Sequence, residues 1–570
     1  MPSELTLPGL FTTLSPSRSS SSAKAITIPG ENALHLSYPD LASYVSDFGN
    51  QLKNVGVSGG DVVSMSLANG LEFVGGFLST GSIRAVSAPL NPAYSQTEIS
   101  FYLKDTQSTV LLIAEFPSGQ EPATIKAGRE CQVKVVTVSS NPKTGVQLNV
   151  IYDPKKTGKS VGMVANANQS DGSDKVLEQD VALVLHTSGT TGKPKAVPLT
   201  HLNLLTTMRN ICNTYEFTPK DRGLLVMPLF HVHGLLCGLL APLLAGSSVV
   251  IPPKFSAHTF WRDFTTEKCN WYTAVPTIHS ILLATPHPNP LPHIRFIRSC
   301  SSSLSPTVFH NLEKTFKAPV LEAYAMSEAA HAMCGSPLPK NGPRYPGSVG
   351  KPQGVELTIR SAEDGKELPQ GKRGEVCIRG KNVMLGYVNN EKANKEGFWD
   401  GGDRGRWFRT GDEGYLTEEG YLVLTGRLKE LINRGGEKIS PIELDSALLS
   451  LDGVAEAVAF GVEDLKYGEK VWAAVVPKSG SSLDEKTLKK ALESKVAKFK
   501  IPERIIFTQA IPKYVFLLMR TRANVSLGDS LIPFHAPTRT ATGKIQRRHV
   551  RDQFVKEEAE KAQAQRQAKL

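Results

Sequence analysis

The segment with the clearest chemistry is a run of hydroxyl residues, glycines and one lysine that follows a short apolar stretch. Residues 182–185 are apolar and predict a buried strand, and the chain then reads T-S-G-T-T-G-K at 187–193. Glycines let the backbone approach an anion and point N–H groups at it, hydroxyls add donors, and a lysine adds a point charge. The predicted phosphate-binding residues are Thr187, Ser188, Gly189, Thr190, Thr191, Gly192 and Lys193. An ordinary serine- and glycine-rich surface loop is the alternative.

The spacing differs from the common nucleotide-binding loop, because the two glycines are three residues apart and Pro194 follows the lysine. The string at 183–201 instead resembles the phosphate-binding loop of the adenylate-forming enzymes, which include acyl-CoA synthetases, luciferases and peptide-synthetase adenylation domains. The resemblance covers about residues 30–550. It implies an α/β fold with a large N-terminal domain of α/β subdomains and a small, mobile α+β C-terminal domain.

Two further strings resemble nucleotide-binding motifs of this family. In Y-A-M-S-E, the resemblance implies that Tyr324 stacks on adenine, Ser327 donates to the α-phosphate, and Glu328 gives a carboxylate oxygen to Mg²⁺. In W-F-R-T-G-D, Asp412 is expected to accept both ribose hydroxyls. Thr190 is the second expected Mg²⁺ ligand. ATP, Mg²⁺ and CoA are therefore the expected co-substrates and cofactor.

The resemblance also assigns roles near the C-terminal domain. In G-R-L-K-E, Arg427 is expected to contact ribose or phosphate, and Lys429 to be the hinge about which the small domain turns. Gly435 and Gly436 are expected to let the pantetheine of CoA pass close to the backbone. Lys544, in A-T-G-K-I, resembles the catalytic lysine that bridges the attacking carboxylate oxygen and the α-phosphate.

The expected acyl pocket is unusually polar. Its expected residues are His231, His233, Ser301, Ser302 and His331, with Ser302 also placed near adenine. Such a set is too polar for a long alkyl chain, whereas donors and a protonatable imidazole suit the second carboxylate of a short acid. With the strings R-S-C-S-S-S-L and Y-A-M-S-E-A-A-H, it resembles the oxalate–CoA ligases among peroxisomal acyl-activating enzymes. A histidine satisfied in a turn and a plain serine-rich loop are the structural alternatives.

The expected reaction has two steps. A carboxylate, most simply oxalate, attacks the α-phosphate of ATP and releases pyrophosphate, and the thiol of CoA then attacks the acyl-adenylate. His231, Glu328 and Lys544 are the expected catalytic residues. The alternatives are a ligase for another short, medium-chain or aromatic acid, a luciferase-like use of the adenylate, and an ATP-binding protein whose catalysis is impaired.

An anomalous insert at 514–539 separates I-P-K from T-A-T-G-K-I, which run together in the family. It opens with the apolar run Y-V-F-L-L-M, a poor solvated loop. Back-translation of Lys513-Tyr514-Val515 permits GTATGT, an intron start, and Ala523-Asn524 permits a branch-point sequence. The codon of Arg539 permits the closing AG. We interpret the segment as a retained intron or a mispredicted exon, with a genuine surface insertion as the alternative.

The length of 570 residues predicts more than one domain. The expected divisions are a flexible terminus at 1–25, an adenylation domain at 26–426, a hinge at 427–430, a C-terminal domain at 431–557 and a charged tail at 558–570. The net charge of +11 is spread along the chain and indicates no sequence-specific nucleic-acid partner. Seven cysteines without regular spacing favour a reducing compartment.

The two ends of the chain and one apolar stretch bear on location. The N-terminus lacks the pattern of a signal peptide. Residues 224–252 contain no charged side chain, but prolines, histidines and a glycine interrupt them, so we expect buried strand–helix–strand rather than a transmembrane segment. The last residues, Ala568-Lys569-Leu570, match the C-terminal peroxisomal address. The expected partner is the peroxisomal import receptor and the expected location the peroxisomal matrix, with a cytosolic pool left open.

Overall fold

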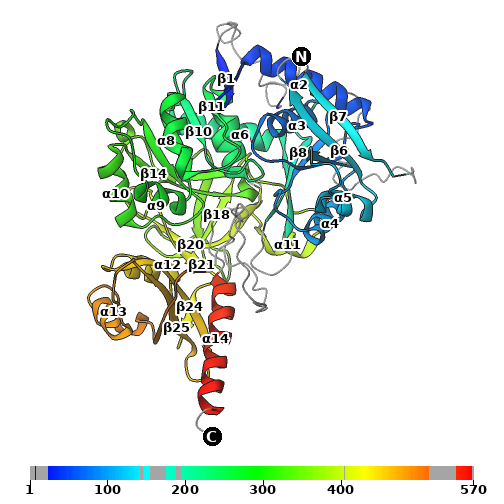
Figure 1. Cartoon of the computed structure of the whole chain (residues 1–570). Helices are drawn as coiled ribbons and strands as arrows, with labels where there is room; N and C mark the ends of the chain where they lie inside the picture. Colours follow the sequence, from blue (N-terminus) through cyan, green and yellow to red (C-terminus); the bar gives the residue numbers. More distant parts are fainter. Residues whose placement is uncertain are drawn as a thin grey trace.

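The computed structural model describes Leu7 and residues 23–141, 145–154, 175–187, 194–402, 405–511 and 547–567. Figure 1 shows a large domain, a smaller domain below it, and a final helix, α14 (Arg547–Gln567), that begins beside β24 of the small domain and extends downward past it. Four sheets form the framework of the described residues, three in the large domain and one in the small domain.

The first sheet has helices on both faces. Its order is β7 (Gly145–Tyr152), β6 (Lys134–Asn141), β5 (Val110–Ala114), β3 (Val62–Ser66), β4 (Val86–Pro89), β8 (Val181–Thr187) and β9 (Lys195–Thr200). Leu112 packs in the same core as helices α2 (Tyr38–Asn54) and α3 (Leu71–Ser82). Leu111 and Ile113 face helices α4 (Gln96–Asp105) and α5 (Ala123–Glu130). This alternation is what a strand buried on both faces requires.

The second sheet carries most of the site. Its order is β16 (Lys351–Pro352), β15 (His331–Gly335), β14 (Val320–Met326), β13 (Phe296–Ser299), β12 (Trp271–Ala274), β10 (Arg222–Leu225), β11 (Ser248–Val250), β1 (Lys24–Ile28) and β2 (Leu34–Ser37). Strands β10, β12, β13 and β14 are parallel, so their carboxyl ends meet at one edge. Ligands of α/β sheets bind at such an edge.

Helices cover the two faces of this sheet. One face packs on α8 (Ala257–Thr266), α9 (Pro276–Ala284) and α10 (Pro306–Phe316). The other packs on α6 (His201–Tyr215), the π-helix η2 (His233–Leu240) and α7 (Ala241–Leu244). The single 3₁₀ turn η3 (Ser327–Ala329) joins β14 to β15. π-Helical segments are often found at functional sites, and η2 begins at His233.

The third sheet closes the large domain below the other two. It contains β17 (Glu356–Arg360), β18 (Gly374–Arg379), β20 (Trp407–Leu416), β19 (Phe398–Trp399) and β21 (Leu422–Arg427), with helix α11 (Glu391–Glu396) alongside. The 3₁₀ turn η4 (Pro339–Asn341) precedes it. Residues 428–430 form the turn that leads from β21 into the small domain.

The small domain has a core of its own. Its sheet has β23 (Glu437–Ile439), β22 (Ile432–Arg434), β25 (Gly468–Pro477), β24 (Val454–Asp464) and β26 (Arg504–Phe507). One face packs on α12 (Pro441–Leu449) and α13 (Glu485–Leu492), followed by the turn η6 (Lys498–Lys500). The other face packs on α14 through Val550 and Phe554, in a cluster that includes Ile511.

The first turn of α14 is fixed next to the hinge. Arg547 makes an ion pair with Asp445 of α12, and its Nη1 donates to the carbonyl of Ala459 at 2.8 Å. Its Nε lies 3.5 Å from a carboxylate oxygen of Glu430, the residue after Lys429. The last helix and the entry into the small domain therefore share one ion-pair cluster.

The structure corrects one sequence prediction and confirms another. Leu7 is buried and its N–H donates to Nδ1 of His201, and β1 begins at Lys24, so the prediction of a flexible 1–25 is wrong at these residues. Residues 145–152 pair with β6 as an edge strand of the first sheet. The prediction for the apolar stretch at 224–252 is confirmed, because it forms buried strands and helix. None of the helices in the described ranges is long and apolar enough to cross a membrane.

Candidate active site

The ends of β14, β20 and β21 bring three predicted nucleotide ligands together. The register of β20 and β21 places Asp412 opposite Arg427, whose Nε donates to Asp412 Oδ1 at 3.0 Å. The hydroxyl of Tyr324 donates to Asp412 Oδ2. Burial, and then the charge of Asp412, raises the pKa of Tyr324 well above its ordinary value, so the phenol stays a donor. The carboxylate is thus oriented from two sides before any ribose arrives.

Glu328 lies in η3 directly beyond β14 and is buried. Its Oε1 accepts from the hydroxyl of Tyr387 at 2.9 Å, and its carbonyl accepts from the N–H of Met384 at 2.8 Å. Lys195 lies over the Tyr387 ring, 4.7 Å from its centroid. Burial raises the pKa of Glu328, and the Tyr387 hydrogen bond acts in the opposite direction.

The arrangement around Glu328 fits a magnesium ion held partly by substrate. In the ranges that the structure describes, no group of three or more His, Cys, Asp or Glu residues could hold a metal. Mg²⁺ commonly binds through one or two carboxylates together with substrate phosphates and water, rather than in an all-protein cage. Glu328 supplies one such carboxylate, and the other predicted ligand, Thr190, lies outside the described residues.

A hollow opens where the first and second sheets meet. His231 and Ser327 line it from one side. Its remaining lining residues are Pro89, Leu90, Asn91, Tyr94, Tyr102, Leu185, His186 and Phe230. Thr187 ends β8 beside it, immediately before the predicted phosphate loop. A substrate in this hollow therefore lies between the predicted α-phosphate donor Ser327 and the predicted acyl-site residue His231.

A buried polar cluster lies next to His231. The N–H of His233 donates to His231 Nδ1 at 3.2 Å. The ring of His233 bonds through Nδ1 to Ser301 Oγ at 3.1 Å and through Nε2 to Thr273 Oγ1 at 2.6 Å, and it stacks on His331 with centroids 5.3 Å apart. Three predicted acyl residues, His233, Ser301 and His331, therefore lie together. Ser302, by contrast, is exposed, and both of its assigned roles remain predictions.

Burial governs the protonation of this cluster. His233 and His331 are fully buried, and burial, followed by the charge of Arg298, lowers the pKa of both rings well below the ordinary value. Both are therefore neutral at physiological pH. The expected imidazolium does not apply to these two histidines, whose N–H groups are the donors they can offer.

The remaining predicted residues lie at the domain boundary. Lys429 is exposed in the turn between β21 and β22, a position compatible with a hinge. Gly435 and Gly436 both have positive φ, 62° and 90°, and form the two-residue turn between β22 and β23, which favours glycine for conformational reasons alone. Ser188, Gly189, Thr190, Thr191, Gly192, Lys193 and Lys544 lie outside the described residues, as does the insert at 514–539.

Sequence reasoning missed residues that act through tertiary contacts. Tyr387 lies 59 residues from Glu328 in the chain, and nothing in the sequence links the two. Arg298 begins the quoted string R-S-C-S-S-S-L, but only the structure shows its burial. His186 precedes the phosphate loop and bonds through Nε2 to Asp105 Oδ2 at 2.7 Å. The position of this titratable residue, directly before Thr187, was the one sequence signal that could have identified it.

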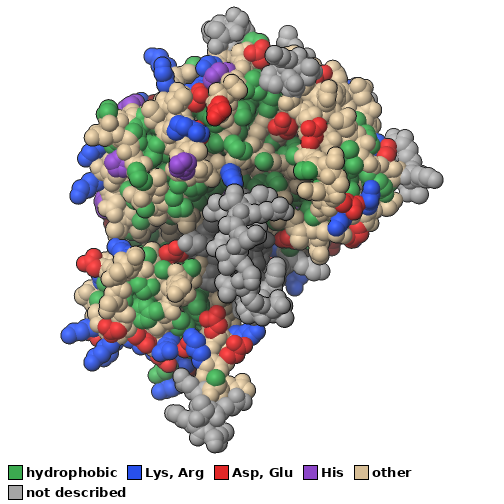
Figure 2. Space-filling view, viewed as in Figure 1, with side chains coloured by type: hydrophobic (Ala, Val, Ile, Leu, Met, Phe, Trp, Pro, Cys, Tyr) green, Lys and Arg blue, Asp and Glu red, His purple; other side chains and the backbone are tan. Residues whose placement is uncertain are grey.

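Figure 2 shows acidic and basic side chains interspersed over the visible face of the small domain. The seven cysteines all lie in the described ranges, where they form no disulfide bond, and five of them are buried.

Comparison with known proteins agrees with this geometry. The family described as AMP-binding enzyme matches residues 19–388, and the AMP-binding enzyme C-terminal domain matches residues 443–515. The chain is 44% identical to the oxalate–CoA ligase of Saccharomyces cerevisiae over 555 residues, covering 94% of this chain and 96% of the relative. It is also 44% identical to that of Arabidopsis thaliana over 538 residues, covering 93% and 96%.

A solved structure supports the same fold. ATP-bound MatB from Rhodopseudomonas palustris is 27% identical, with a TM-score of 0.79, and the match covers 96% of this chain and 99% of that chain. The two matched family regions, the extent of the relatives and the nucleotide-side geometry all point the same way. The chain belongs to the AMP-binding enzyme family and is an AMP-forming acyl-CoA ligase that uses ATP, Mg²⁺ and CoA.

Proposed function

We propose that this ligase converts oxalate to oxalyl-CoA. The observation that carries the proposal is the buried cluster of His233, His331, Ser301 and Arg298, because it offers hydrogen-bond donors and one cation where an alkyl chain would need apolar side chains. The name of the two relatives at 44% identity supports the same substrate.

In the first step, one carboxylate oxygen of oxalate attacks the α-phosphorus of ATP, and the bond to the β-phosphate oxygen breaks to release pyrophosphate. Asp412 holds the ribose, Arg427 orients Asp412, and Ser327 donates to the α-phosphate. Glu328 holds Mg²⁺, which when bound neutralises phosphate charge. The loop Thr187–Lys193 carries the remaining phosphate charge, and Lys544 stabilises the α-phosphate as it gains charge.

In the second step, the thiolate of CoA attacks the acyl carbon and AMP leaves with the electrons of the broken acyl–oxygen bond. Lys544 must leave the site for the thiol to enter, and rotation of the small domain about Lys429 provides this movement. The exposed turn at Lys429 and the separate core of the small domain support such a rotation.

Import into the peroxisome by a receptor that binds Ala568-Lys569-Leu570 is part of the proposal. It rests on the terminal residues alone. A fluorescent protein fused at the N-terminus should collect in peroxisomes, and deletion of the last three residues should release it to the cytosol. Identical distributions of the two fusions would contradict the assignment.

The substrate is tested by measuring pyrophosphate release and thioester formation with oxalate, malonate, acetate, octanoate and coumarate, each with and without CoA. We expect oxalate to have the highest kcat/KM, and oxalyl-CoA to form only when ATP and CoA are both present. A preference for octanoate or coumarate would contradict the proposal, because either acid would have to place apolar atoms against the polar cluster.

A further inference from the structure

Arg298 is a buried cation that has no carboxylate partner among the residues that the structure describes. It lies in β13 and its side chain is fully buried. Its Nε donates to the hydroxyl of Tyr215 at 2.9 Å, its Nη1 to Thr273 Oγ1 at 3.2 Å, and its Nη2 contacts His331 Nε2 at 3.2 Å. Within the described ranges, no Asp or Glu forms an ion pair with it. A desolvated guanidinium is costly unless its donors are used, so its three neutral partners need an explanation.

The contact with His331 fixes the tautomer of that ring. A guanidinium has donors and no acceptor, so Nε2 of His331 must accept from Arg298. Because the buried ring is neutral, its single proton is then on Nδ1. Nδ1 is buried and has no hydrogen-bond partner in the described part of the chain. His331 also has φ of 93°, an uncommon conformation for a residue other than glycine. The ring is therefore held so that one buried donor stays unpaired.

A second path runs from the same arginine to Ser301. Thr273 Oγ1 accepts from Arg298, and its own hydrogen can be donated to His233 Nε2, only 2.6 Å away. The proton of the His233 ring is then on Nδ1, where it is donated to Ser301 Oγ at 3.1 Å. The hydroxyl hydrogen of Ser301 is thereby left for another acceptor. Ser301 has φ of 73°, so its backbone is also held in an uncommon conformation.

We propose that Arg298 is a positioning residue that fixes His331 as an Nδ1–H donor and His233 as a donor to Ser301, so that the acyl pocket presents hydrogen-bond donors to the carboxylate that is not activated. This inference rests on the proposed function for the identity of the acid. Arg298 itself does not need to touch the substrate. It supplies the positive charge behind two neutral donors. A carboxylate binds rings whose proton is fixed on one nitrogen more strongly than rings whose proton is distributed over both nitrogens.

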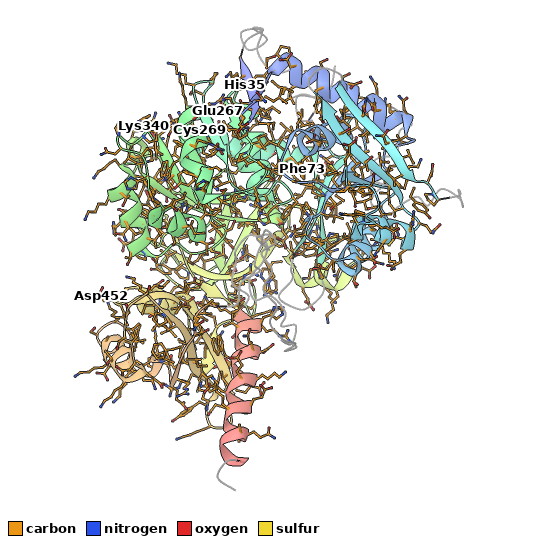
Figure 3. All side chains as sticks on the ribbon, in the orientation of Figure 1. His35, Phe73, Glu267, Cys269, Lys340 and Asp452 are labelled. Atoms are coloured by element: carbon orange, nitrogen blue, oxygen red, sulfur yellow. The ribbon has the colours of Figure 1, made fainter. Side chains whose placement is uncertain are left out.

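The test compares substitutions at Arg298 with a matched arginine of the same sheet. Arg298→Met removes both charge and donors, and Arg298→Gln keeps a donor for His331 Nε2. Arg222→Met is the control, because Arg222 pairs with Glu267 at 2.9 Å and also bonds to Thr27 and Ser248. Figure 3 shows Glu267 near His35 at the outer end of the large domain, away from Asp452 and the small domain. The control thus breaks a similar number of partly buried bonds in the same sheet without touching either histidine.

We expect Arg298→Met to raise KM for oxalate about tenfold or more, with a smaller change in kcat and with KM for ATP within about twofold. Arg298→Gln should recover part of the loss, and Arg222→Met should leave KM for oxalate unchanged even if the protein is less stable. In a double-mutant cycle with His331→Asn, Arg298→Met should cause a smaller loss than it causes in the wild type, because only the path through Thr273 and His233 is then left for it to disturb. Asparagine is a suitable replacement because it tolerates positive φ.

The tautomer is measured directly by ¹⁵N NMR of histidine-labelled full-length enzyme, with His331→Asn identifying the signal. The expected result is a neutral ring protonated at Nδ1 in the wild type and a mixture of tautomers in Arg298→Met. An Nε2-protonated ring in the wild type, full additivity in the cycle, or equal losses for oxalate and ATP would overturn the inference. If the wild type is Nδ1-protonated but does not use oxalate, the proposed function fails and the assignment of Arg298 stands.

Discussion

The hydrogen bond from Tyr387 to Glu328 allows a test with a single-atom change. Tyr387→Phe removes the hydroxyl that donates to Glu328 Oε1 at 2.9 Å and leaves the ring, and its contact with Lys195, in place. A hydrogen bond to a charged group contributes about 1.5–3 kcal/mol, and about 1.4 kcal/mol corresponds to a factor of ten. We therefore expect the Mg²⁺ concentration for half-maximal activity to rise about tenfold or more.

The pH dependence gives this prediction a direction. Burial already raises the pKa of Glu328, and Tyr387 lowers it by binding the ionised form. Removing the donor raises the pKa further, so a larger share of Glu328 is protonated at any given pH and cannot bind Mg²⁺. The loss should therefore grow as the pH falls, and the acidic limb of the activity profile should move to higher pH.

The assay is pyrophosphate release with oxalate at several Mg²⁺ concentrations and pH values. Tyr345→Phe is the matched control, because its hydroxyl donates to Glu419 Oε2 at 2.7 Å on the exposed surface. This variant should behave as the wild type. If Tyr387→Phe lost activity equally at every pH, and excess Mg²⁺ restored none of it, the assigned link between Tyr387, Glu328 and the metal would be refuted.

Three further predictions address the nucleotide, acid stability and the insert. Asp412→Asn should weaken ATP binding about tenfold or more in calorimetry, since it removes the anion that Arg427 and Tyr324 orient, and an unchanged affinity would contradict the ribose role. His279 is buried and its pKa is lowered to about 3, so only the unfolded chain takes up its proton between pH 6.5 and 5.5. The contribution of His279 to stability should fall by about 1 kcal/mol over that unit, and the unfolding free energy of His279→Asn, measured by urea titration, should depend less steeply on pH than that of the wild type. Deletion of 514–539 removes 26 of the 35 residues between Ile511 and Arg547. Stability should change by only about 1 kcal/mol, because closure entropy depends weakly on length, while pyrophosphate release rises. Equal release from both forms would make the segment a tolerated insertion.

Helices and strands could be predicted well where the sequence carries their start signals. Helix α12 begins at Pro441 after the capping residue Ser440, and both residue types are start signals that can be read from the sequence. The edge strand β7 alternates apolar and polar residues over 146–150, V-Q-L-N-V, but only one of its eight residues is buried. Its pairing with β6 decides its structure.

The candidate site could be predicted as a set of residue types but not as a network. The nucleotide side followed from strings that keep their order, and the structure brings Tyr324, Asp412 and Arg427 into contact. The state of the acyl side depends on burial and on contacts between distant strands. His331 was expected from the sequence, but its neutral form follows from burial and then from the charge of Arg298, and its donor atom follows from the contact with Arg298, 33 residues away in the chain. No local pattern encodes such a contact.

Because α14 is fixed to the small domain at its first turn, its far end would report a rotation of that domain. The helix has 21 residues and is therefore about 30 Å long, and Arg547 fixes its near end beside Glu430. A rotation of the small domain by about 20° would displace the far end of such a rod by about 10 Å. A fluorophore there and another on the large domain would convert each adenylation and thioester step into a change in energy transfer, so that turnover could be followed in single molecules.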